Sequence, residues 1–326
     1  MAALGLLPPS TRRGLQHEIT ENLAQPGACL YLAMDFGVIL PNYGPEGSHE
    51  NILATARAAE RLGYHSIWTT DHVLIPRGDA ARFENIFECI TTLAYLAGLT
   101  SRVRLGISSL VLPLRNPVIV AKQIAALDVL CSGRSMLCVS AGWSAGEFAN
   151  LGERFDDRGR RLNEAIQVLR LLWDGDGGEQ KTFTGEHYQF KQGVFSPAPH
   201  QPGGPPIWIG GNSGAAIRRA AKLGDGWHPS GIGIEDLRRG VARLRDLAGS
   251  RQVTISLRTR LSFDASHPSA YIKGSPQQIT EELMRFAEAG LEHLVVTFME
   301  RDQAARELAM EQFAQDVIPA LSGASS

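Results

Sequence analysis

A regular alternation of short apolar segments with longer amphipathic segments constrains this chain more than any other feature. In the first unit, "DFGVIL" (35–40) is a continuous apolar run, and "HENILATARAAERLG" (49–63) has apolar residues at helical spacing and ends in glycine. Eight such units follow one another from residue 34 onward. The expected strands cover residues 35–40, 64–70, 103–112, 134–142, 206–211, 225–229, 253–261 and 292–298. The expected helices cover residues 49–63, 85–99, 116–131, 160–175, 213–224, 234–249, 275–290 and 301–321.

Apolar strands that alternate with helices predict a parallel sheet covered on both faces. With eight units, this α/β chain is best explained by a closed (β/α)8 TIM barrel, and a doubly wound open sheet is the alternative. The 326 residues, 44% of them hydrophobic, suit one large barrel or two small domains. The alternation breaks at residues 176–205, where Gly, Pro and aromatic residues are frequent. We interpret this segment as an insertion after the fourth β/α unit that carries a short hairpin.

The first 33 residues differ from the rest. They contain neither the apolar segment of a signal peptide nor a membrane span, so we expect a loosely ordered extension, or a short outer helix at 15–24, before a barrel domain at 34–326. A formal net charge of −2 gives no reason to expect nucleic acid or a membrane as partner. The cysteines form no C-x-x-C pair, so we expect reduced thiols in a cytoplasmic protein. They are Cys29, Cys89, Cys131 and Cys138.

The active site of a (β/α)8 barrel lies at the C-terminal ends of its strands. The residues that end or follow the expected strands are therefore the candidates for chemistry. They are Pro41-Asn42-Tyr43, Asp71-His72, Ser108-Ser109, Gly142-Trp143-Ser144, Gly210-Gly211-Asn212-Ser213 and Trp227-His228.

This set of residues argues against several reaction classes. Metal-dependent hydrolysis would need several His and carboxylate ligands, but the first strand has no H-x-H pair and no H-E-x-x-H occurs, so we expect no metal. No expected strand ends in a lysine that could form a Schiff base. Aromatics, small hydroxyls, one histidine and a Gly-rich turn instead suit a flat conjugated cofactor with a phosphate tail.

The Gly-rich turn is "WIGGNSGAAIRRAA", in which a strand leads through Gly210 and Gly211 to Asn212 and Ser213 and then into a helix. Glycines allow close backbone approach, and the free N–H groups of a helix start attract anions. A capped turn without a ligand explains the same pattern. The turn is not a G-x-G-x-x-G motif, so the sequence gives no support for nicotinamide binding in that mode.

Five ordered segments together resemble the bacterial luciferase-like monooxygenase superfamily. They are "MDFGVILPNYG", "AAERLGYHSIWTTDH", "LGISSLVLPLRNPVIVAKQIAALDVLCSGR", "AGWSAGEFANLG" and "PPIWIGGNSGAAIRRAAKLGDGWHP", and the resemblance covers most of the chain from Met34. The Asp-His pair after the second strand most resembles the branch that uses the deazaflavin coenzyme F420. FMN-using members share the barrel, so FMN is the alternative cofactor.

The resemblance assigns roles to particular residues. It places His72 near the reactive carbon of the ring, as acid/base or as stabiliser of the reduced anion, which suits an imidazole at neutral pH. Asp71 would orient the site or hydrogen-bond the cofactor; a solvated strand-exit turn is the alternative for both residues. The cofactor phosphate is expected near the segment from Gly210 to Ser213.

The resemblance also concerns the third and fourth strands. It implies a bulge with a non-proline cis peptide at Ser108–Ser109 that supports one face of the ring, with a regular trans strand as the alternative. Gly142 and Trp143 would form a wall of the cofactor pocket, although packing in the core or at the rim explains Trp143 equally well.

Two positions depart from the members that oxidise a sugar phosphate. Four residues after the histidine they have a tryptophan where this chain has Pro76, and three residues after the glycine they have a glutamate where this chain has Ala145. Glu147 lies two residues further on. The sequence therefore does not support sugar-phosphate oxidation.

We accordingly expect an oxidoreductase that transfers hydride between coenzyme F420 and a small organic substrate. The first alternative is an FMN-dependent monooxygenase that uses O2 and a separate flavin reductase, and the second is a flavin-binding barrel without turnover. The expected partners are a small-molecule substrate, a second copy of the chain and a flavin or deazaflavin reductase.

Overall fold

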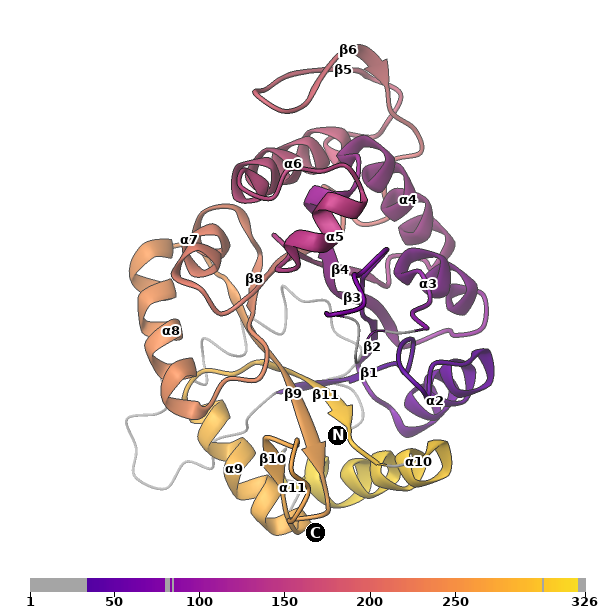
Figure 1. Ribbon diagram of the computed structural model, residues 1–326, viewed down its shortest axis with the longest axis vertical. Coiled ribbons are helices and arrows are strands. Elements are labelled where there is room, and N and C mark those ends of the chain that lie inside the picture. Colours follow the sequence, from indigo (N-terminus) through magenta and orange to yellow (C-terminus); the bar gives the residue numbers. More distant parts are fainter. Residues whose placement is uncertain (1–33, 80–82, 84, 301, 322–326) are drawn as a thin grey trace.

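The computed structural model describes residues 34–79, 83, 85–300 and 302–321 (Figure 1). Eight parallel strands form a closed ring, in which β1 pairs with both β2 and β11 while β8 pairs with β9. This confirms the (β/α)8 barrel and excludes the open doubly wound sheet. The barrel strands are β1 (Asp35–Ile39), β2 (Ser66–Thr69), β3 (Arg104–Val111), β4 (Ser135–Ser140), β7 (Ile207–Gly210), β8 (Gly226–His228), β9 (Thr254–Ser262) and β11 (His293–Phe298).

Helices cover the outside of the ring, each after its strand (Figure 1). Their starts follow local capping: Ser48 and Asn116 accept hydrogen bonds from the first backbone N–H groups of their helices. The segment expected as a helix at 85–99 is helical only over Cys89–Ala97, because Glu88 caps it there. The helices are α2 (His49–Leu62), α3 (Cys89–Ala97), α4 (Pro117–Leu130), α6 (Arg158–Trp173), α7 (Gly214–Leu223), α8 (Ile234–Ala248), α9 (Pro276–Glu288) and α10 (Gln303–Gln312).

The predicted insertion carries the predicted hairpin. Strands β5 (Gln180–Thr184) and β6 (Gln189–Val194) pair antiparallel and stand away from the barrel beyond α6 (Figure 1). The stacked rings of Phe183 and Phe190, 6.0 Å apart, hold the hairpin together.

Sequence periodicity missed several short elements. They are helix α5 (Ala145–Asn150) after β4, a 3-10 turn (Leu112–Leu114) and strand β10 (Ile272–Lys273), which pairs with β9. The last expected helix is also interrupted, by a π-helical turn (Phe313–Val317) before α11 (Ile318–Leu321). Pro319 has no N–H to donate, so the regular α-helical ladder cannot continue through it.

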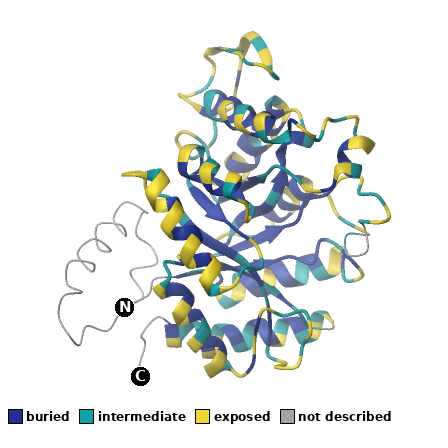
Figure 2. Cartoon of the chain, turned by 60° about the vertical axis from the view of Figure 1, so that its left-hand side comes forward, coloured by how far each residue is buried: buried dark blue, intermediate teal, exposed yellow. Residues whose placement is uncertain are grey.

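Side chains fill the barrel interior, which Figure 2 shows as buried strands inside partly exposed helices. Trp68 stacks on Trp208, with ring centroids 5.4 Å apart, and on His228 at 5.5 Å. Gly106 makes room for Trp68, because a Cβ there would lie 2.3 Å from the indole. This aromatic layer closes the barrel below its C-terminal rim, so any ligand must bind above it.

Some expectations concern the chain ends and cysteines. Cys89, Cys131 and Cys138 are free and buried, as expected of core thiols. Cys29 and the expected extension at 1–33 lie outside the described residues. Within the described part of the chain, none of the helices combines the length and the apolar character that crossing a bilayer requires.

Candidate active site and cofactor cavity

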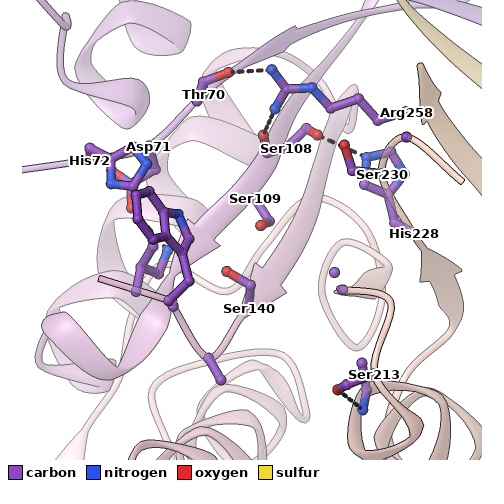
Figure 3. Close-up of a pocket in the computed structure, with 18 of the residues that line it drawn as sticks. Thr70, Asp71, His72, Ser108, Ser109, Ser140, Ser213, His228, Ser230 and Arg258 are labelled. Carbon is purple, nitrogen blue, oxygen red and sulfur yellow. Dashed lines mark hydrogen bonds between the residues drawn. The ribbon is translucent and has the colours of Figure 1, made fainter. Parts of the chain in front are cut away.

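A cavity of about 670 Å³ opens over the C-terminal ends of the strands, a volume that suits a cofactor with its substrate. We call it the rim cavity. Figure 3 shows His72 on one side of it, Ser213 toward the other end, and Ser109 and Ser140 between them. The predicted site residues that line it are Asp71, His72, Ser108, Ser109, Gly142, Trp143, Gly210, Gly211 and Ser213. Other lining residues include Tyr43, Thr70, Phe83, Asp156, Arg158, Arg219, His228, Arg258, Arg260 and Tyr271.

Several strand-end candidates do not line the cavity: Pro41, Asn42, Ser144, Trp227 and Asn212. Of these, Asn212 was expected to help hold the cofactor phosphate. Its amide nitrogen donates to the carbonyl of Ser230 at 2.9 Å, and its amide oxygen accepts from the Ser230 N–H at 2.9 Å. The side chain thus ties the turn after β7 to the turn after β8.

His72 leaves the end of β2 and is 7% exposed. Its Nδ1 lies 2.9 Å from Oε2 of Glu147 on α5, and the other carboxylate oxygen accepts from the Val73 N–H at 2.7 Å. Burial raises the pKa of Glu147, but the bonds from His72 and the Val73 backbone outweigh it, so this pKa is lowered. Glu147 is therefore ionised at neutral pH.

The ionised carboxylate fixes the tautomer of the imidazole. Because a carboxylate only accepts hydrogen bonds, the proton between the two groups belongs to Nδ1 of His72. The lone pair of the neutral ring is then on Nε2. No described residue is hydrogen-bonded to Nε2, and the ring lines the cavity. His72 can accept a proton from a ligand there, and Glu147 would stabilise the resulting cation.

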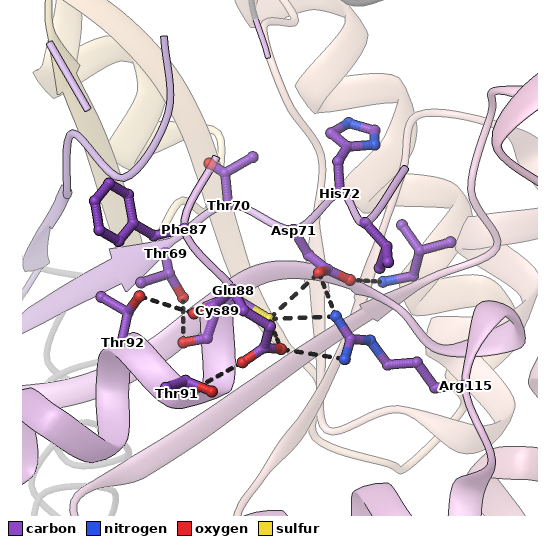
Figure 4. A network of polar contacts seen from close by, with 12 residues as sticks. Thr69, Thr70, Asp71, His72, Phe87, Glu88, Cys89, Thr91, Thr92 and Arg115 are labelled. Carbon is purple, nitrogen blue, oxygen red and sulfur yellow. Dashed lines mark hydrogen bonds and ion pairs between the residues drawn. The ribbon is translucent and has the colours of Figure 1, made fainter. Parts of the chain in front are cut away.

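The side chain of Asp71 points away from that of His72, and Figure 4 shows the two leaving the backbone in opposite directions. Its carboxylate accepts from Arg115 at 2.7 Å and from the Val111 N–H at 2.9 Å, while the Cys89 thiol lies 3.4 Å away. Burial lowers the pKa of Arg115, but the charge of Asp71 outweighs it and the pKa is raised. These contacts fit the orienting role expected for Asp71 better than a direct bond to a cofactor.

Aromatic rings surround His72. The Phe83 ring centroid lies 4.3 Å from that of His72, and the Trp143 ring meets it edge-on at 5.7 Å. Tyr43 continues this wall at 5.6 Å from Phe83. Trp143 is 54% exposed, which a packing role in the core does not explain. The aromatic wall, defined as Tyr43, Phe83 and Trp143, gives the cavity an apolar side beside the imidazole.

Strand β3 has the predicted bulge. The Ser108–Ser109 peptide is cis, and the pairing with β4 shifts between Ile107 and Leu110. Arg258 on β9 donates to the Ser108 carbonyl at 2.6 Å and to Oγ1 of Thr70 at 3.1 Å (Figure 3). The bulge is thereby held against the end of β2.

His228 lies below the bulge and belongs to the barrel interior. Its Nε2 is 2.8 Å from Oγ of Ser108, and its Nδ1 is 2.8 Å from Oγ of Ser256. Burial, and after it the charge of Arg258, together lower the pKa of His228 to about 3. This ring is neutral and serves as a fixed support for Ser108.

The turn after β7 has the features of an anion site. Gly211 has φ 121°, a conformation that favours glycine, and Ser213 caps α7 by accepting from the Ala216 N–H at 3.2 Å. Two arginines line the cavity near the first residues of α6 and α7: Arg158 donates to the Gly142 carbonyl and Arg219 to the Gly159 carbonyl. Free N–H groups and cations together fit a phosphate.

Sequence reasoning missed two kinds of site residue. In the sequence, Glu147 stands out only because it lies two residues beyond the position where the members that oxidise a sugar phosphate have a glutamate. Nothing in the sequence shows that α5 directs its side chain toward His72. Arg258 and Arg260 lie in an apolar strand two residues apart, which puts both on one face. Two arginines on one face of a barrel strand are the sequence feature that would have indicated these site residues.

Comparison with known proteins gives the family. A sequence profile described as luciferase-like monooxygenase matches residues 34–270. The chain belongs to this family. An uncharacterized protein from Mycobacterium tuberculosis shares 34% identity over 205 residues, which cover 59% of this chain and 69% of that protein. The F420-dependent glucose-6-phosphate dehydrogenase of Amycolatopsis mediterranei shares 25% identity and covers 86% of this chain and 95% of its own.

A solved structure confirms the architecture of this luciferase-like protein. It is the oxygenating constituent of 3,6-diketocamphane monooxygenase from Pseudomonas putida, in complex with FMN. It superimposes with a TM-score of 0.73 at 18% identity and covers 88% of this chain and 98% of that one. The family therefore includes both F420-dependent and FMN-dependent oxidoreductases.

Proposed function

We propose that this protein binds coenzyme F420 in the rim cavity and transfers hydride between it and a small organic substrate, with His72 as acid/base. The observation that carries the proposal is the placement of His72: Nδ1 is bound to the ionised carboxylate of Glu147, and the ring lines the cavity with Nε2 unbonded among the described residues. The F420-dependent relative that matches nearly full length supports this cofactor.

The residues present fit such a cofactor. Gly210 lets β7 pack against the bulge, since a Cβ there would lie 3.0 Å from the Ser109 hydroxyl. Gly211, with φ 121°, would leave the backbone open where a phosphate approaches. Arg158 and Arg219 would neutralise the phosphate. The bulge at Ser108–Ser109 would support the ring, while the aromatic wall excludes water from its edge. When bound, the deazaflavin supplies hydride transfer.

The remaining chemistry belongs to this chain's own residues. In the oxidation of an alcohol, Nε2 of His72 would take the hydroxyl proton, and the negative Glu147 would stabilise the cation that forms. In the reverse direction the protonated ring would return that proton. Asp71 is not placed to act on the substrate, because its carboxylate is bound by Arg115 and by the Val111 N–H.

FMN-dependent monooxygenation is the second candidate function. The FMN-bound structural relative and the apolar side of the cavity both favour it. The same anion site and the same bulge would hold FMN. A reductase that supplies reduced flavin would then be the partner, and O2 would be the second substrate.

A titration distinguishes the two candidates. The purified protein is titrated with F420 and with FMN while cofactor fluorescence is followed, and the bound, reduced cofactor is then offered alcohols and ketones with and without O2. We expect tighter binding of F420 and oxidation of the reduced cofactor by a ketone without O2. Tighter binding of FMN and O2-dependent turnover would favour the monooxygenase, and binding without any turnover would contradict an enzyme.

The variant Gly211→Val tests the anion site in the same titration. A side chain there would block the approach of a phosphate and be strained at φ 121°. We expect cofactor affinity to fall at least about 10-fold, the loss of one good charge-assisted contact. Gly249→Val is the matched control, since Gly249 also has positive φ but lies outside the cavity with open space around its Cβ. Unchanged cofactor affinity in Gly211→Val, with only the melting temperature lowered, would make the turn purely structural.

A further inference from the structure

The rim cavity has more positive charge than a cofactor phosphate accounts for. Four arginines line it, at positions 158, 219, 258 and 260, against two carboxylates, Asp71 and Asp156. Asp71 is already paired with Arg115. Arg158 at the start of α6 and Arg219 on α7, the helix that follows the proposed phosphate turn, both have roles in the proposed phosphate site, so two arginines on β9 remain.

The guanidinium of Arg258 is occupied by hydrogen bonds within the protein. It donates to the Ser108 carbonyl and to the hydroxyls of Thr70 and Tyr43, at 2.6, 3.1 and 3.3 Å. Its function is therefore to hold the bulge and the aromatic wall in place.

The guanidinium of Arg260 is not occupied in this way by the described residues. Arg260 lies two residues further along β9, about 7 Å nearer the mouth by strand geometry. Its guanidinium lies over the Tyr271 ring, 4.7 Å from the centroid, and among the described residues it has no hydrogen bond and no ion pair. Glu300 follows β11, the strand paired with β9, and Arg260 is not among the groups that shift its pKa: burial raises this pKa, and backbone hydrogen bonds and then the charge of Arg306 lower it.

A half-buried guanidinium without an anion is a binding site for one, because its five donors suit a bidentate carboxylate. The lining combines this cation with the aromatic wall of Tyr43, Phe83 and Trp143. We infer that Arg260 recognises a carboxylate on the substrate, and that the substrate is a small aromatic or alicyclic carboxylic acid. This inference rests on the proposed function, because it places the substrate in the same cavity.

The test uses benzoate and cyclohexanecarboxylate as probes, each beside its neutral amide. Binding is measured by calorimetry to wild type, Arg260→Gln and Arg260→Lys, with and without saturating cofactor. We expect at least one carboxylate to bind wild type and to lose about 10- to 100-fold in affinity in Arg260→Gln, the range for a charge-assisted hydrogen bond. Arg260→Lys should retain part of the affinity, and amide binding should not change.

Two controls make the result specific. Arg238→Gln removes an arginine of α8 that pairs with Glu235 outside the cavity, and it should leave carboxylate binding unchanged. Tyr271→Leu removes the ring that supports the guanidinium, so it should weaken carboxylate binding less than Arg260→Gln does. This second variant also keeps the test readable if Arg260→Gln folds poorly.

Equal carboxylate affinity in wild type and Arg260→Gln, or no binding of either carboxylate to wild type, would overturn the inference. Cofactor affinity separates this failure from a failure of the proposed function. If F420 and FMN bind and cycle but the carboxylates do not bind, only the assignment of Arg260 is wrong. If neither cofactor binds, the titration without cofactor still tests Arg260.

Discussion

The rim and the interior of the barrel each contain a buried histidine, and the two are held in opposite ways. His72 at the rim is 7% exposed, and His228 in the interior is 3% exposed. Nδ1 of His72 meets the carboxylate of Glu147, which would stabilise an imidazolium. Both nitrogens of His228 meet serine hydroxyls, and burial, followed by the charge of Arg258, lowers its pKa to about 3. The two rings therefore differ in their partners: a carboxylate faces His72, whereas two hydroxyls and a nearby cation surround His228.

This contrast explains a division of labour in the site. The interior layer of Trp68, Trp208 and His228 is neutral and closely packed, and it fixes Ser108 from below. The rim has the charged groups and the open nitrogen. A cofactor resting on the bulge would then meet a rigid support on one side and an exchangeable proton on the other.

The largest expected effect comes from removing the histidine at the rim. His72→Gln removes the base while the anion site stays intact, so turnover with the best substrate of the alcohol and ketone panel should fall by about 10²–10⁴-fold with little change in cofactor affinity. Steady-state assays at saturating cofactor measure this. His49→Gln, at an exposed position on α2, is the control and should keep wild-type turnover. Wild-type turnover in His72→Gln would rule out the acid/base role.

A smaller effect should follow from changing the partner rather than the ring. Glu147→Gln keeps the shape of the contact but removes the charge 2.9 Å from Nδ1. We expect turnover to fall by about 10- to 100-fold, as for a charged hydrogen bond, and the pH dependence of turnover to shift. Glu282→Gln, which removes the surface pair with Arg285, is the matched control. A change in melting temperature without any shift of the pH profile would give Glu147 a structural role only.

The smallest expected effect concerns the histidine of the interior and the dependence of protein stability on pH. The unfolded chain takes up a proton on His228 as the pH falls through its ordinary pKa of 6.5, whereas the folded protein does not until about pH 3. The free energy of unfolding should therefore drop as the pH falls below about 7, by about 2 kcal/mol between pH 7 and 5 for this one histidine. Above pH 7 it contributes no pH dependence.

Urea unfolding at several pH values checks this prediction. His228→Gln will be less stable at every pH, because Ser108 and Ser256 lose their partner, but its stability should fall about 2 kcal/mol less between pH 7 and 5 than that of wild type. His49→Gln should retain the wild-type dependence. Parallel curves for wild type and His228→Gln would mean that His228 is not held neutral.

The fold was predictable from the sequence because the β/α units repeat a strand and a helix of regular length, and most of the helices begin at a side-chain cap. The rim positions followed from the barrel, since strand ends converge there whatever the side chains are. Glu147 could not be predicted, because the short helix α5 has too few residues to show a period. Asp71 shows the same limit: the sequence places it beside His72, but only packing shows that it faces Arg115.

A structure of the protein bound to the cofactor that binds more tightly tests the central claim most directly. We predict the phosphate on the turn of Gly211 and Ser213, the ring against the Ser108–Ser109 bulge, and its reactive carbon or nitrogen within about 3–3.5 Å of Nε2 of His72, the distance at which groups react. A ring bound elsewhere in the cavity, with Nε2 of His72 out of reach of its reactive atom, would contradict the account.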